Sequence, residues 1–171
     1  GLGANAVDSI TTGDYNVGLG ENAGTGITEG SNNVAIGNTA MYANTTGSHN
    51  TAIGYDALET NVSGVTNVAV GYRALRVSTA SNNTGLGAQS LMANTTGTRN
   101  TAVGKDSLVA NTTAVDNTAV GFYALKANTT GGDNVAVGSY SLNANTTASN
   151  NTAVGYNSLT ANTTGAENVA V

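Results

Sequence analysis

One phrase of 17 residues repeats through this chain from end to end, and no other feature constrains the fold as strongly. Its consensus is G-Y-x-[AS]-L-x-A-N-T-T-G-x-x-N-[TV]-A-V. The glycine after each [TV]-A-V phrase marks ten units, at Gly3, Gly20, Gly37, Gly54, Gly71, Gly87, Gly104, Gly121, Gly138 and Gly155. We therefore expect residues 1–171 to form a single repeat array rather than a domain around one compact core.

The spacing of these glycines changes once, from 17 to 16 residues between Gly71 and Gly87. The missing residue falls in the turn phrase VSTASNN, and the phrases on either side of it are intact. Because loops tolerate deletions better than the elements they connect, the deletion favours a stack of strands joined by turns.

The length and chemistry of the unit select the fold class. Helical repeats need about 34–47 residues, whereas this unit is shorter and rich in Gly, Asn, Thr and Val, which favour turns and strands. We predict an all-β fold, a parallel β-solenoid or β-roll of about ten coils, each made of two short strands. Like residues would stack about 4.8 Å apart and give a rod of about 48 Å.

Two apolar positions recur in each coil. In [TV]-A-V the outer residues share one face of the strand and Ala points to the other. The second phrase centres on a leucine, at Leu58, Leu75, Leu91, Leu108, Leu125, Leu142 and Leu159, with Met41 and Val7 in the same position of two other units. Both strand faces are uncharged in all units, a pattern typical of strands buried on two sides. We expect one face to line the coil and the other to contact neighbouring chains.

An asparagine precedes every strand phrase, at Asn16, Asn33, Asn50, Asn67, Asn83, Asn100, Asn117, Asn134, Asn151 and Asn168. Stacked asparagines can bond to one another through their side-chain amides. We interpret this column as a structural ladder. The glycine that follows the strand is expected to supply a positive φ or room for close approach of two coils.

Composition excludes several functions. Charged residues are 9% of the chain and the net charge is −5 without any basic run, which argues against nucleic acid and anionic membranes as partners. No apolar stretch approaches the ~20 residues of a membrane-spanning helix, so we expect no membrane insertion in this segment. With no Cys and a single His49 in a turn position, we predict no metal site and no cofactor.

No catalytic constellation stands out either. The phrase GLGENAG at 18–24 resembles a phosphate-binding loop, but its glycines follow the repeat and no lysine is placed for phosphate. No nucleophile, base and orienting group form a recognisable set, so we predict no catalytic residues and no enzyme. Both ends fall inside a repeat, and we expect a segment of a longer chain.

The strand phrases also resemble a known family. NNVAIGNTA (32–40), NTAIGYDAL (50–58) and NVAVGYRAL (67–75) are similar to the head repeats of trimeric autotransporter adhesins, although the unit is longer here. The array also resembles repeats of phage tail fibres. The resemblance covers all ten units and implies a left-handed parallel β-roll, packed as a homotrimeric rod that projects from a surface.

Two sets of side chains could reach a ligand. Aromatic residues occur one or two positions after the glycine that ends each strand phrase, called the register glycine below. They are Tyr55, Tyr72, Phe122, Tyr123, Tyr140 and Tyr156. They could pack on an adjacent coil or chain, or form an exposed strip for a glycan or a lateral partner. Glycosylation sequons begin at Asn44, Asn61, Asn82, Asn94, Asn111, Asn128, Asn145, Asn150 and Asn162. Since N-T-T is also a good turn sequence, these sequons need not carry glycans.

These observations predict a structural or adhesive fibre segment, extracellular, on a cell surface or in a virion appendage. Its partners would be further copies of itself, as a homotrimer or filament, and a glycan or protein of a host surface. Alternatives are a phage tail-fibre shaft, a free extracellular filament subunit, or a solenoid that binds ice or glycans. Threonine and valine alternate in the strand row, which does not suit the uniform threonine grid expected of an ice binder.

Overall fold

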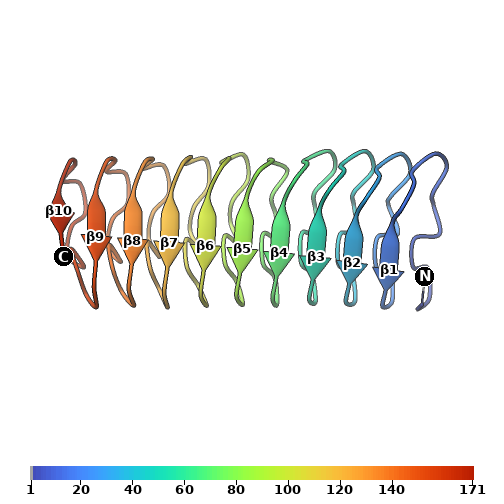
Figure 1. Ribbon diagram of the computed structural model, residues 1–171, viewed down its shortest axis with the longest axis horizontal. Helices are drawn as coiled ribbons and strands as arrows, with labels where there is room; N and C mark the ends of the chain where they lie inside the picture. The colour runs from blue at the N-terminus through green and yellow to red at the C-terminus, as the bar shows by residue number, and fades with distance from the viewer. Residues whose placement is uncertain (1) are drawn as a thin grey trace.

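The computed structural model describes residues 2–171 and confirms a parallel β-solenoid of 17-residue coils (Figure 1). One ten-stranded sheet has its strands in sequence order, so the chain makes about nine turns. The strands are β1 (Val17–Leu19), β2 (Val34–Ile36), β3 (Thr51–Ile53), β4 (Val68–Val70), β5 (Thr84–Leu86), β6 (Thr101–Val103), β7 (Thr118–Val120), β8 (Val135–Val137), β9 (Thr152–Val154) and β10 (Val169–Ala170). The described residues contain no helix.

Equivalent residues of successive coils pair with one another. Val34 of β2 lies opposite Thr51 of β3, and the same register continues along the sheet. It also survives the shortened coil, where Val68 of β4 pairs with Thr84 of β5. The deletion is absorbed in the turn near Thr79, as the sequence predicts, because the strands on both sides keep their partners.

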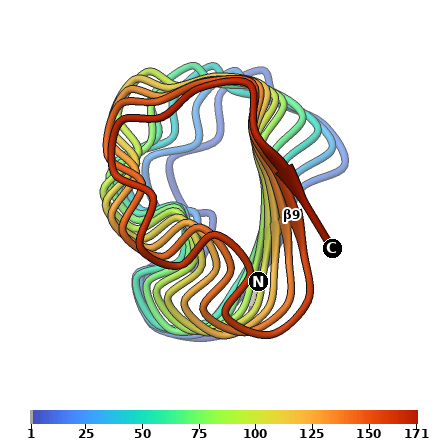
Figure 2. The same ribbon diagram turned by 90° about the vertical axis from the view of Figure 1, so that its left-hand side faces the viewer.

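The coil encloses a narrow core. Figure 2, a view along the rod, shows the strands on one side of the coil and turns forming the rest of its outline. In the third coil, Ala52 of the strand and Ala57 and Leu58 of the turn segment have no exposed surface. The strand alanine therefore faces inward. The predicted leucine column is buried at Leu58, Leu75, Leu91, Leu108, Leu125 and Leu142, and Leu159 is partly buried.

Only one strand forms in each coil, so the prediction of two was wrong. The segment with the leucine, for example residues 55–60, is a series of turns. Asp56 and Leu58 have φ angles of 54° and 52°, which a strand cannot contain. As a result, the N–H of Asp56 donates to the carbonyl of Asn38 in the preceding coil at 3.2 Å, and that of Leu58 donates to Ala74 in the following coil at 3.0 Å. The segment is bonded on both sides without being a strand.

The register glycine meets both expectations of the sequence. Gly104 has a φ of +130°, which residues with a side chain adopt only under strain. A Cβ at this position would lie 2.6 Å from the carbonyl oxygen of Gly121 in the next coil. Where a further coil follows, the corner after the strand is thus too tight and too twisted for any other residue.

Replacing this glycine should separate the two effects. We expect Gly104→Ala to lower the free energy of unfolding by about 3 kcal/mol or more, because strain and the clash with backbone add. Gly155→Ala is the matched control, since φ is +124° there but nothing lies within 4 Å of the added Cβ; it should cost about 1–3 kcal/mol. Urea unfolding of both variants measures the difference, and equal losses would contradict a role for close approach.

Candidate functional site

The asparagine before each strand forms a continuous ladder inside the rod. The backbone N–H of Asn50 donates to the side-chain oxygen of Asn33 at 2.9 Å, and the amide of Asn67 donates to the side-chain oxygen of Asn50 at 3.1 Å. The amide of Asn50 also donates to the carbonyl of Gly64 at 2.8 Å. Asn33, Asn50, Asn67, Asn83, Asn100, Asn117, Asn134 and Asn151 are fully buried. Asn16 and Asn168 continue the column at its partly exposed ends. Each side chain therefore ties its own coil to the next one.

A second asparagine ladder runs beside the first, and sequence reasoning missed it. It contains the asparagines of the A-N-T-T-G turns, Asn44, Asn61, Asn94, Asn111, Asn128, Asn145 and Asn162. The amide of Asn61, for example, donates to the side-chain oxygen of Asn44 at 2.9 Å. The signal was present in the sequence, since this asparagine recurs at the same spacing as the first. The phrase A-N-T-T-G also suits an exposed turn and a sequon, and neither of these interpretations predicts a ladder.

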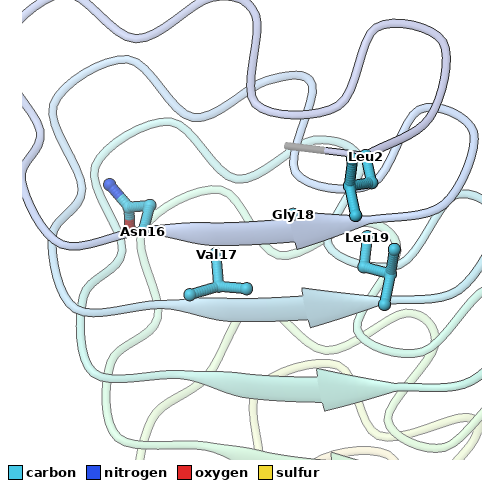
Figure 3. Close-up of a pocket in the computed structure, with 5 residues that line it drawn as sticks. All are labelled: Leu2, Asn16, Val17, Gly18 and Leu19. Carbon is cyan, nitrogen blue, oxygen red and sulfur yellow. The ribbon is translucent and has the colours of Figure 1, made fainter.

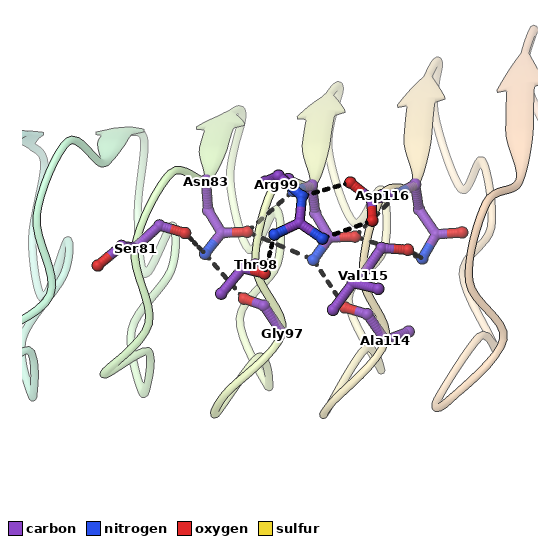
Figure 4. Close-up of polar contacts among 10 residues, drawn as sticks. Ser81, Asn83, Gly97, Thr98, Arg99, Ala114, Val115 and Asp116 are labelled. Atoms are coloured by element: carbon purple, nitrogen blue, oxygen red, sulfur yellow. Dashed lines mark hydrogen bonds and ion pairs between the residues drawn. The ribbon is translucent and has the colours of Figure 1, made fainter.

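Both ladders converge on one column of backbone carbonyls. The amides of Asn83 and Asn94 each donate to the carbonyl of Gly97 at 2.9 Å, and Figure 4 shows Asn83 directed at Gly97. In the shortened coil Ser78 takes the place of the second asparagine, and its hydroxyl accepts the amide of Asn94 at 3.3 Å. Within residues 2–171, no buried side-chain N or O lacks a partner. The polar half of the interior is therefore fully satisfied.

The second ladder is made of asparagines that also begin glycosylation sequons. Asn44, Asn61, Asn94, Asn111, Asn128 and Asn145 have no exposed surface, and their amide nitrogens are engaged inside the rod. In the folded chain these nitrogens are therefore inside the rod. Asn162 is partly exposed, and among the sequons of the described chain Asn82 and Asn150 are exposed.

A single charge should break the second ladder. In Asn111→Asp the carboxylate replaces an amide that donates to Asn94 and to the carbonyl of Ala114, so two buried acceptors would face an anion. We expect a loss of about 3 kcal/mol at pH 7. Burial raises the folded-state pKa of the new carboxyl, so the loss should shrink below its unfolded pKa of about 3.9. It should not vanish, because a protonated carboxyl donates one hydrogen bond where the amide donates two.

Asn82→Asp is the matched control for this variant, because Asn82 is exposed. Its unfolding free energy should change by less than about 0.5 kcal/mol. Thermal melts of both variants at neutral and acidic pH make the comparison. A loss at Asn111→Asp that did not depend on pH would contradict the role of the amide as a donor.

The aromatic side chains form two separate groups rather than one strip. The rings of Tyr55 and Tyr72 stack with their centroids 5.8 Å apart and stay 47% and 45% exposed. The second group contains Phe122, Tyr123, Tyr140 and Tyr156, whose rings meet mostly edge to face. Both groups therefore pack along the rod and also present surface to solvent.

Ion pairs connect neighbouring coils at the surface. Both the Nε and a terminal nitrogen of Arg99 donate to the carboxylate of Asp116, at 2.6 and 2.7 Å (Figure 4). The hydrogen bond from Arg99 lowers the pKa of Asp116, and the same bond raises the pKa of Arg99. In the same way, the hydrogen bond to Glu59 raises the pKa of Arg76. These pairs neutralise most of the arginine charge on the rod.

The Arg99–Asp116 pair predicts a small pH dependence. Because the pKa of Asp116 is lower in the folded state, the pair stabilises the fold above the unfolded pKa and this contribution is lost as pH falls through the folded pKa. Asp116→Asn should lower the melting temperature at pH 7 by at most about 3 °C. The decrease should vanish once the pH lies below the folded-state pKa of Asp116, which is itself lower than the ordinary value for aspartate. Glu167→Gln, at the equivalent and exposed position three coils further on, is the control. A decrease that persisted at low pH would assign the effect to something other than the ion pair.

The outward face of the sheet is an uncharged surface. Its two rows are Val17, Val34, Thr51, Val68, Thr84, Thr101, Thr118, Val135, Thr152 and Val169, and Leu19, Ile36, Ile53, Val70, Leu86, Val103, Val120, Val137 and Val154. Most of these side chains are half-buried by their neighbours along the rod, whereas Leu86 in its middle and most of those near the ends are exposed. A shallow hollow at β1 is lined by Leu2, Asn16, Val17, Gly18 and Leu19 (Figure 3).

Within residues 2–171, no three acidic or histidine side chains come together as metal ligands. No helix in this part of the chain has the length and apolar character needed to cross a bilayer. Comparison of the chain with protein families, with curated proteins and with solved structures gave no match. The candidate sites are therefore surfaces, namely the outward sheet face and the two aromatic groups.

Proposed function

We propose that this chain is a segment of a structural, adhesive fibre outside the cell, in which three copies pack with their sheets around a common axis. Its role is to project or display a binding surface, on a cell or on a virion appendage, rather than to catalyse a reaction. The likeness of its strand phrases to the heads of trimeric adhesins supports this proposal, and so does the solenoid itself, since a rod grows in length with each added coil.

The observation that carries the proposal is the outward face of the sheet. Every strand from β2 to β9 buries its central residue and leaves the first and third partly exposed. Those residues are Val, Ile, Leu or Thr and never charged. A sheet face in contact with water normally carries polar and charged side chains, whereas threonine is the only polar residue on this one. A large uncharged and mostly apolar surface commonly marks a contact with another chain. A second and third copy supply a cover of matching length and spacing.

Neighbouring residues of one strand provide the test. Ala119 points into the core and is fully buried, whereas Val120 lies on the outward face. We expect Ala119→Asp to abolish folding, because an unpaired carboxylate in the core costs several kcal/mol. Val120→Asp should leave the single chain folded but separate the copies. Thr113→Asp, in an exposed turn, should affect neither property.

Native mass measurement and circular dichroism distinguish these outcomes. The parent segment should have three times the 16.8 kDa mass of one chain, and Val120→Asp should have the mass of one chain with an unchanged spectrum. A parent segment that is a folded monomer at micromolar concentration would overturn the trimer. A trimer that survives Val120→Asp would place the interface on another face.

A further inference from the structure

The only two lysines of the chain lie beside its larger group of aromatic rings. The Nζ of Lys126 is 4.1 Å from the ring centre of Tyr123, and that of Lys105 is 5.9 Å from the ring centre of Phe122. Both lysines are exposed. The surface formed by Lys105, Phe122, Tyr123, Lys126, Tyr140 and Tyr156 is called the lysine–aromatic patch below.

The rings of this patch hold one another in place. Phe122 and Tyr123 have centroids 3.9 Å apart, and Tyr140 meets each of them edge to face at 5.5 Å. Tyr156 extends the group from the next coil, 6.3 Å from Tyr140. Rings fixed by contacts between coils lose little freedom when a ligand binds, which favours affinity.

The lysine–aromatic patch is also locally positive. Within residues 2–171, Lys126 makes no ion pair, and the only carboxylate near Lys105 is that of Asp106, at 3.6 Å. Two lysines and one aspartate leave a charge of +1 in a chain whose net charge is −5.

The other aromatic group differs in this respect. Next to Tyr72, the guanidinium of Arg73 lies 3.2 Å from the carboxylate of Asp56, and that of Arg76 lies 2.7 Å from Glu59. Its positive charges are therefore neutralised. Both groups consist of aromatic rings that contact one another between coils, but they differ in free positive charge.

We propose that the lysine–aromatic patch binds an acidic glycan, a sugar chain that carries carboxylates. The apolar faces of sugar rings can pack on the aromatic rings, and the lysines can pair with the carboxylates through charge-assisted hydrogen bonds. Single-stranded nucleic acid uses the same two side-chain types, but it needs a positive groove along its backbone, which a chain with five basic residues and ten acidic ones lacks. This inference rests on the proposed adhesive function and names the ligand class.

Calorimetric titration of the folded segment tests it, with hexamers of galacturonic acid and of sialic acid as probes and a glucose hexamer as the neutral control. We expect one acidic hexamer to bind at least about tenfold more tightly than the glucose hexamer. The binding should weaken as salt is added, because the lysines are exposed to solvent.

Two pairs of variants locate the site. Lys105→Gln with Lys126→Gln should weaken binding of the acidic hexamer about tenfold, while Arg73→Gln with Arg76→Gln should leave it unchanged. Tyr140→Ala should lose binding, and Tyr72→Ala, in the other aromatic group, should retain it. Circular dichroism of each variant confirms that the coils are intact.

Three results would overturn the inference. They are no preference of the segment for either acidic hexamer, full binding by the double lysine variant, or tighter binding of a thymidine oligonucleotide than of both acidic hexamers. Mass measurement on the same samples keeps this test separate from that of the fibre. A trimer that binds no acidic sugar overturns the patch alone, and a monomer that binds one overturns the trimer alone.

Discussion

The buried asparagine side chains of this rod depend on the neighbouring coils for partners. An asparagine side chain has a carbonyl and two N–H donors, and none of these can be left unpaired in an interior without a cost of about 1–3 kcal/mol. A single coil cannot satisfy them, because the acceptor of one asparagine bonds the backbone and amide of the next, as Asn50 does with Asn67. Stacking in strict register is therefore a condition of folding, and it explains why the phrase can be repeated but hardly varied.

The thinness of the core follows from the same arrangement. Two asparagine columns occupy one part of the interior, and the remainder is filled by alanine or another small residue and, in most coils, by one leucine. The leucine lies in a left-handed backbone conformation, as at Leu108 with a φ of 50°, which costs about 1–2 kcal/mol. Its burial, and the bonds its neighbours make to adjacent coils, offset that strain. The positions free to vary are those whose side chains leave the coil, and these carry the aromatic rings, the charges and the proposed binding surfaces.

Much of the fold could be predicted from the sequence because it depends on periodicity. The spacing of the glycines determined the coil length, the deletion at Thr79 identified a turn, and the leucine column identified the core. The prediction of a second strand in each coil was wrong. Residue type alone does not reveal the turn-forming φ angles at residues such as Asp56 and Leu58. The second asparagine ladder was missed for a related reason. The phrase A-N-T-T-G suits an exposed turn, and only the burial of Asn111 distinguishes a ladder from a turn.

The sequence by itself determined that this protein is a stack of equivalent coils, because a fixed period of apolar, asparagine and glycine residues admits no other regular arrangement. Which strand face enters the coil was decided only by the tertiary structure. Ala119 and Val120 are both uncharged, so the sequence pattern could not show which of them faces the core. At this position of the strand the coil is wide enough for alanine but not for a larger side chain. The separation of the aromatic residues into a neutral and a positive group was likewise decided in three dimensions, where Asp56 and Glu59 reach the arginines and no carboxylate among the described residues pairs with Lys126.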